Sequence, residues 1–142
     1  MIARSLAALV GIALAGSAWG DVCAVSVSAP NFGDYDTTSR NPTDAVGQVR
    51  ISCVSGASIA ISAGGAGTFF PRAMTSGTAT LAYNLYTDAA RTRIWGEWGT
   101  GTEVRFVAQG SNRSVPVFGR IPPLQDVPSG LYTDTLVATV YF

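Results

Sequence analysis

The only two glutamates of the chain, Glu97 and Glu103, flank a glycine-rich turn, with Trp95 and Trp98 close by in the sequence. Two carboxyl groups beside aromatic rings are the arrangement that glycosidases use, with one group as acid and the other as base or nucleophile. Nothing in the neighbouring sequence supplies a cleft or a cause for a raised pKa, so we expect surface acids on a solvated turn. Trp95 and Trp98 are candidate ligand contacts, although core packing is the favoured interpretation for Trp95.

Three further acids, Asp34, Asp36 and Asp44, lie in one polar segment and could in principle bind calcium. Their spacing does not follow that of a calcium-binding loop, and Asp side chains commonly bond to the backbone of turns. The chain has no histidine, which removes the most common general base and the most common zinc ligand. We therefore predict no catalytic residue, no metal site and no cofactor.

The composition restricts the class of partner. The chain has 142 residues, enough for one domain, and only 13% of them are charged. Nine basic residues are balanced by nine acidic ones, so no net charge attracts a polyanion. We predict a non-enzymatic protein that does not bind nucleic acid.

The first twenty residues have the pattern of a secretory signal peptide. A short basic start at 1–4 precedes an apolar run at 5–15, and small residues occupy Ala18 and Gly20 before the expected cleavage. The apolar run is shorter than the roughly 20 residues that span a bilayer. We predict a signal peptide at 1–20, a domain at 21–142 without a membrane span, and export through the periplasm to the cell surface or medium. An uncleaved anchor, or an earlier cleavage that leaves part of 13–20 attached, are the alternatives.

An exported protein with two cysteines is expected to join them, so we predict a disulfide between Cys23 and Cys53. Both lie in the apolar phase of alternating segments. Their sulfur atoms are therefore expected to face inward and to meet across the core.

Apolar residues alternate with polar or small ones along most of the chain, which is the period of a β-strand with one buried face. Turn-forming Gly, Pro and Asn separate these segments. The pattern predicts an antiparallel β-sandwich. The alternating segments are 23–27, 49–53, 59–61, 81–85, 104–106, 115–117 and 136–142.

The last predicted strand, 135–142, runs to the end of the sequence without a charge or proline to close it. A strand at a sheet edge leaves backbone groups unpaired and invites another chain to pair with it. Either a partner strand is missing, or earlier strands of the chain cover this one.

The ordered motifs resemble the spore coat protein U domain family, whose members include subunits of archaic chaperone–usher pili. No motif is specific alone, but together they follow the family's order over the whole chain after residue 20. They are Asn31-Phe32-Gly33-Asp34-Tyr35-Asp36, the segment 47–53 that ends in Cys53, Arg72-Ala73-Met74, the segment 81–88, Trp95-Gly96, Phe118-Gly119-Arg120-Ile121-Pro122, Gly130-Leu131-Tyr132-Thr133-Asp134-Thr135 and Thr139-Val140-Tyr141.

The resemblance implies an immunoglobulin-like sandwich that lacks its final strand. In that family a periplasmic chaperone lends the missing strand, and at the outer-membrane usher the next pilus subunit replaces it. A strand added in this way contributes main-chain hydrogen bonds and fills pockets with alternate side chains. The residues expected to form the acceptor groove and to contact the chaperone are Leu136, Ala138, Val140, Tyr141 and Phe142.

One feature departs from a pilus rod subunit. Cleavage after Gly20 leaves only Asp21 and Val22 ahead of Cys23, which is too short a segment to donate as a strand. The chain is therefore expected to accept a strand rather than to give one, as a tip or terminal subunit would. The alternative function is a self-contained secreted coat or binding domain with no role in polymerisation.

Overall fold

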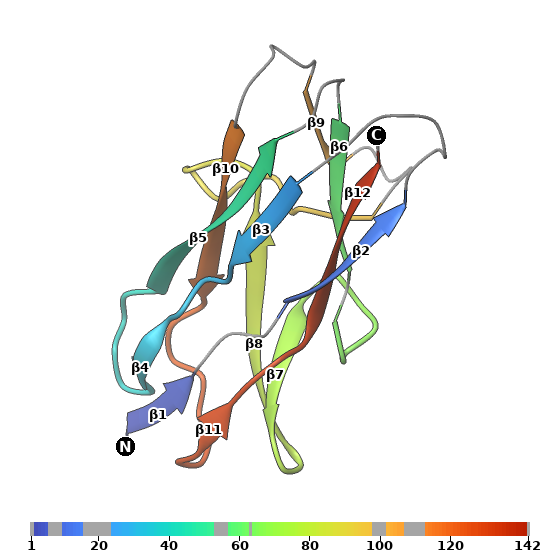
Figure 1. Cartoon of the computed structure of the whole chain (residues 1–142). Helices are drawn as coiled ribbons and strands as arrows, with labels where there is room; N and C mark the ends of the chain where they lie inside the picture. The colour runs from blue at the N-terminus through green and yellow to red at the C-terminus, as the bar shows by residue number, and fades with distance from the viewer. Residues whose placement is uncertain are drawn as a thin grey trace.

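The computed structural model describes residues 2–5, 10–15, 24–52, 57–62, 64–97, 102–106 and 113–141. Every regular element within these ranges is a strand (Figure 1), and none of the described residues forms a helix that could cross a bilayer. The strands are β1 (Ile2–Ser5), β2 (Val10–Ala15), β3 (Ala24–Ser28), β4 (Gly33–Asp36), β5 (Thr43–Ser52), β6 (Ala57–Ile61), β7 (Arg72–Ser76), β8 (Ala79–Tyr86), β9 (Val104–Phe106), β10 (Arg113–Ile121), β11 (Leu131–Tyr132) and β12 (Leu136–Tyr141).

The strands form three sheets. One has five strands in the order β3-β5-β10-β8-β7, and a second has four in the order β2-β12-β6-β9. A small third sheet, β11-β1-β4, lies at the end where the chain begins (Figure 1). Neighbouring strands are antiparallel except for the pairs β1–β11 and β2–β12, which are parallel. The prediction of an all-β, mainly antiparallel fold is confirmed.

The core is built from the alternating positions that the sequence pattern indicated. In β8, Leu81, Tyr83 and Leu85 are each at most 1% exposed. In β5, Val49 and Ile51 are equally well buried. Because successive side chains on a strand point to opposite faces, each strand contributes one apolar face to the interior. The remaining core residues of the two large sheets include Ile59, Ile61, Met74, Val117, Ile121, Leu136, Ala138 and Val140.

The loop between β3 and β4 is held against β10. The Phe32 ring packs on Gly119 so closely that a Cβ there would lie 2.6 Å from Phe32 Cζ. The same ring meets Tyr83 edge to face, with centroids 6.1 Å apart. In β4, the Tyr35 hydroxyl donates to the backbone oxygen of Pro122 at 2.7 Å. Two family motifs that are distant in sequence are therefore joined by direct contact.

Candidate functional site

The last strand presents a strictly alternating inner face. Leu136, Ala138 and Val140 are at most 2% exposed, whereas Val137 between them is 40% exposed. The side chain of Tyr141 and the whole of Phe142 lie outside what the structure describes. Three of the five expected acceptor residues thus line the interior of the sandwich.

Both edges of β12 are paired in the full chain. On one side β6 is antiparallel, with Ala138 opposite Ile61. On the other side β2 is parallel over six residue pairs, from Leu136 opposite Val10 to Tyr141 opposite Ala15. The second neighbour of β12 therefore comes from the segment that the sequence predicts to be a signal peptide (Figure 1). Within 21–142 alone, β6 is the neighbour that β12 retains among the described residues.

The hydrogen bonds of Val137 show which backbone groups face which neighbour. Its N–H donates to Ser62 Oγ at 2.9 Å, and its carbonyl accepts from the Ser62 N–H at 2.9 Å. Backbone groups of successive residues in a strand point to alternate sides. Those of Ala138 therefore point toward β2, as do those of Leu136 and Val140.

A narrow space between the two large sheets reaches this strand. The end of β3 and the residues Leu136 and Ala138 of β12 both line this space, and most of the side chains that line it are apolar. β3 and β2 are edge strands of their respective sheets. β2 is therefore the last strand of its sheet on the side of β12 that faces away from β6. The remaining lining residues are Val27, Ser28, Ala29, Pro30, Val49, Ile61, Tyr83, Leu85 and Val117.

A buried arginine fixes β6 beside the opposite sheet. Arg72 is fully buried and donates to the backbone oxygens of Ser62 (3.0 Å), Ile61 (3.2 Å) and Trp95 (2.5 Å), and to Asn84 Oδ1 (2.8 Å). Burial lowers the pKa of its guanidinium to about 10. Arg72 was noted only as part of a motif in the sequence, and its role as a buried crosslink was missed.

A second buried polar contact anchors the chain just ahead of β12. Asp134 accepts from the Tyr83 hydroxyl at 2.5 Å and from the Gly65 and Thr135 N–H groups at 2.9 Å. Burial and this hydrogen bond raise the pKa of Tyr83 well above its ordinary value. Gly64 has a φ of +77°, and a Cβ there would collide with the Asp134 carboxylate. Asp134 thus sets where β12 begins.

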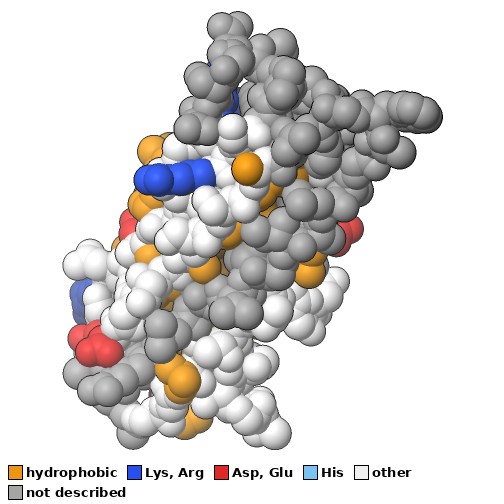
Figure 2. Space-filling model, viewed as in Figure 1, with side chains coloured by type: hydrophobic (Ala, Val, Ile, Leu, Met, Phe, Trp, Pro, Cys, Tyr) orange, Lys and Arg blue, Asp and Glu red, His pale blue; other side chains and the backbone are white. Residues whose placement is uncertain are grey.

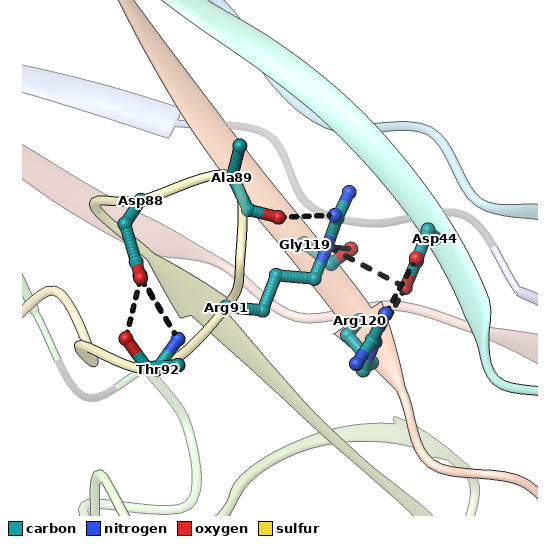
Figure 3. A network of polar contacts seen from close by, with 7 residues as sticks. All are labelled: Asp44, Asp88, Ala89, Arg91, Thr92, Gly119 and Arg120. Atoms are coloured by element: carbon teal, nitrogen blue, oxygen red, sulfur yellow. Dashed lines mark hydrogen bonds and ion pairs between the residues drawn. The ribbon is translucent and has the colours of Figure 1, made fainter.

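The side of the sandwich at β5 and β10 carries an exposed network of charges (Figure 3). Arg120 donates to both carboxylate oxygens of Asp44, at 2.7 and 2.8 Å, across the β5–β10 ladder. This contact lowers the pKa of Asp44 and raises that of Arg120. Arg91 adds a hydrogen bond to the Gly119 carbonyl at 3.1 Å and lies 3.5 Å from Asp44.

Asp88 organises the neighbouring turn. Its carboxylate accepts from the Thr92 hydroxyl and from the Thr92 and Arg93 N–H groups. These bonds, led by the Thr92 hydroxyl, hold the pKa of Asp88 at about 2. These contacts show that Asp88, the acidic residue at the end of the motif 81–88, stabilises the turn that follows β8.

The candidate catalytic and metal-binding acids have different surroundings. Glu97 is exposed whereas Glu103 is buried, and Asp36 bonds to the Thr38 N–H and hydroxyl. Among the described residues, no group of three or more Cys, Asp or Glu side chains could hold a metal ion. Asp34 is exposed in β4, and Asp44 is engaged with Arg120.

Of the two candidate ligand-binding tryptophans, the structure describes Trp95 but not Trp98. Trp95 is fully buried, and its ring N–H donates to the Ile59 carbonyl at 3.0 Å, so its ring offers no surface to a ligand in this conformation. Trp98 lies outside the described residues. An open cleft nearby is lined by other aromatic and polar residues, including Phe69, Phe70 and Arg93. Phe70 is 81% exposed.

Cys23 and Cys53 also lie outside the described residues, so the disulfide remains a prediction. The residues next to them, Ala24 and Ser52, are register partners on the adjacent strands β3 and β5. The two strands that lead to the cysteines are thus neighbours in one sheet, and the position of the two sulfur atoms stays a prediction.

On the face shown in Figure 2, exposed hydrophobic side chains occur in several separate places and charged side chains are few. Among the residues whose burial the structure describes, the exposed large hydrophobic ones are Val46, Phe70, Leu124, Leu131 and Val137.

Comparison with known proteins identifies relatives of this fold. A structure similar to it, with a TM-score of 0.61, is a chain in the crystal structure of the CsuC–CsuE chaperone–tip adhesion subunit pre-assembly complex from archaic chaperone–usher Csu pili of Acinetobacter baumannii. The two chains are 19% identical, and the match covers 86% of this chain but 40% of the other. This likeness confirms the immunoglobulin-like sandwich.

Sequence comparison gives the family. The chain is 34% identical over 142 residues to Protein U of Myxococcus xanthus, and the match covers 87% of this chain and 79% of that protein. A family model described as the Spore Coat Protein U domain matches residues 11–139, which begin within β2 and end within β12. The chain belongs to the Spore Coat Protein U domain family.

Proposed function

We propose that this protein is an exported, non-enzymatic structural subunit that a β-strand from a partner completes, in a chaperone–usher pilus or a related surface structure. The observation that carries the proposal is the position of β12. Its inner residues Leu136, Ala138 and Val140 belong to the core, yet its second neighbour is residues 10–15. Removal of residues 1–20 leaves the backbone groups on that side of β12 without this strand.

The unpaired edge of β12 indicates which kind of partner the processed chain would bind. An incoming strand satisfies the backbone groups of Leu136, Ala138 and Val140 and covers the apolar space between the sheets. A periplasmic chaperone would supply this strand first, and other pilus subunits would replace it at the outer-membrane usher. The structurally similar chain belongs to a pre-assembly complex of a chaperone with a tip adhesion subunit, which supports this class of partner. With two residues ahead of Cys23 after the predicted cleavage, a terminal or tip position suits the chain.

Co-expression tests the proposal. The full chain is directed to the periplasm with a chaperone from a chaperone–usher system of its own genome, and the complex is isolated by affinity and size. We expect a one-to-one complex whose subunit begins at Asp21 by intact mass, with a mass 2 Da lower than that of the reduced chain because Cys23 and Cys53 are joined. Val140→Asp places a charge in the core face of β12 and should abolish the complex, whereas Val137→Asp, on the exposed face, should keep it.

The alternative is a self-contained secreted coat or binding domain. The open cleft beside the strongly exposed Phe70 is the feature that favours it. A processed chain that is monomeric, soluble and cooperatively folded without any partner would support this alternative and contradict strand completion.

A further inference from the structure

We propose that residues 10–15 act as a placeholder strand, which closes the groove beside β12 in the precursor until cleavage or displacement opens it. This inference rests on the proposed function, because it assigns a state to the same strand-accepting edge. The observation behind it is that β2 is a full neighbour of β12, matched along the whole strand.

The register of β2 suits this edge. Its sequence, Val-Gly-Ile-Ala-Leu-Ala, carries no charge and alternates large with small residues. Paired residues on neighbouring strands share a face of the sheet, so the large residues take the register positions of the buried side of β12. The pairs are Val10 with Leu136, Ile12 with Ala138 and Leu14 with Val140.

The N-terminal segment is paired at a second place as well. β1 is antiparallel to β4 over Ile2–Ser5 and parallel to β11 at Arg4 and Ser5. β11 and β12 are consecutive strands of the chain. The two N-terminal strands thus pair in order with the last two strands of the chain, β1 with β11 and β2 with β12. The N-terminal segment therefore contacts the end of the chain at two places.

Attachment to the same chain gives β2 an advantage over any separate strand. A tethered segment competes at an effective concentration on the order of millimolar. Against a partner at micromolar concentration, this disfavours invasion by about a thousandfold for strands of equal intrinsic affinity. The precursor is therefore closed to partners, and removal of residues 1–20 converts it to a form that accepts a strand.

The test uses the full chain, produced in a cytoplasm where the predicted cleavage does not occur. Ile12→Asp puts a charge at the register position of Ala138, and Ala13→Asp is the matched control at the register position of Thr139. Amide exchange is followed by NMR at Ala138 and Val140, whose N–H groups face β2. Thr139 is the internal control because its N–H faces β6.

We expect Ile12→Asp to accelerate exchange at Ala138 and Val140 by at least about tenfold, because the charge would stand at the register position of the buried Ala138, and to leave Thr139 unchanged. A labelled peptide of residues 8–17 should bind this variant and should not bind the wild-type chain or Ala13→Asp. Rapid exchange at Ala138 in the wild-type full chain, or equal behaviour of the two variants, would overturn the placeholder.

The two proposals fail in different ways. If the wild-type precursor has an unprotected β12 edge and still yields a chaperone complex after processing, the placeholder is wrong and the proposed function stands. If the edge is protected in the precursor but the processed chain needs no partner, the placeholder stands and strand completion is wrong.

Discussion

At the scale of single residues, the side chains that look able to do chemistry serve the fold. The Arg72 guanidinium donates hydrogen bonds to three backbone carbonyl oxygens and to one side-chain amide oxygen. The Asp134 carboxylate accepts hydrogen bonds from a tyrosine hydroxyl and from two backbone N–H groups. Buried polar groups are costly unless they are bonded in this way. The polar motif residues are therefore explained as buried crosslinks and turn anchors.

Replacement of Arg72 tests its role as a crosslink. Arg72→Ala leaves the carbonyls of Ile61, Ser62 and Trp95 buried without their donor, so we expect a loss of about 3 kcal/mol or more in the free energy of unfolding. Arg72→Lys should not restore stability, because an ammonium cannot reach partners in so many directions. Urea denaturation measures both, with the exposed Arg40→Ala as control. An unchanged urea midpoint for Arg72→Ala would contradict the assignment.

The low pKa of Asp88 predicts part of the loss of folding stability at acidic pH. The folded carboxylate stays ionised to about pH 2, whereas in the unfolded chain it takes up a proton near its ordinary pKa of 3.8. Its stabilising effect is therefore complete above about pH 4 and is lost as the pH falls toward 2. Asp88→Asn should flatten the fall of unfolding free energy between pH 4 and pH 2, and Thr92→Val should flatten it in part. An identical pH profile for Asp88→Asn would refute this.

At the scale of elements, periodicity predicted the strands whose apolar alternation is strong. The inner faces of β5, β8 and β12 are the predicted ones. β7 was missed because Arg72 takes a core position beside Met74 and breaks the apolar pattern. β4 was missed because Tyr35 is its one buried residue. Strands β1 and β2 were missed because 1–20 is predicted to be a signal peptide, and because the partners β11 and β12 lie more than a hundred residues away, which no local pattern encodes.

The contact between Phe32 and Gly119 joins two elements and can be tested by a double-mutant cycle. A Cβ at residue 119 would lie within 3.0 Å of two Phe32 ring atoms, so Gly119→Ala should cost about 1–3 kcal/mol through overpacking. In the Phe32→Leu background the smaller side chain leaves room, and the same substitution should cost less. Additive effects of the two changes would show that the elements do not meet at this point.

At the scale of the whole molecule, the proposed function rests on one edge of the sandwich. The two large sheets share a core, and in the full chain β2 pairs with the edge of β12 that faces away from β6. Sequence analysis indicated the inner face of β12 and left open whether a strand of a partner or an earlier strand of the chain covers its edge. It could not show that residues 10–15 pair with β12 in the full chain. The apolar part of a signal peptide and a short apolar strand have the same sequence pattern.

The most direct test of strand completion is the stability of the processed chain, residues 21–142, as a function of strand concentration. Urea unfolding is measured with increasing amounts of a synthetic peptide of residues 8–17, and with a peptide carrying Ile12→Asp as control. Strand completion predicts a poorly stable chain whose unfolding free energy rises with the wild-type peptide, by about 2.7 kcal/mol at a hundred times its dissociation constant. A processed chain that unfolds cooperatively at one midpoint, whatever the concentration of either peptide, would contradict it.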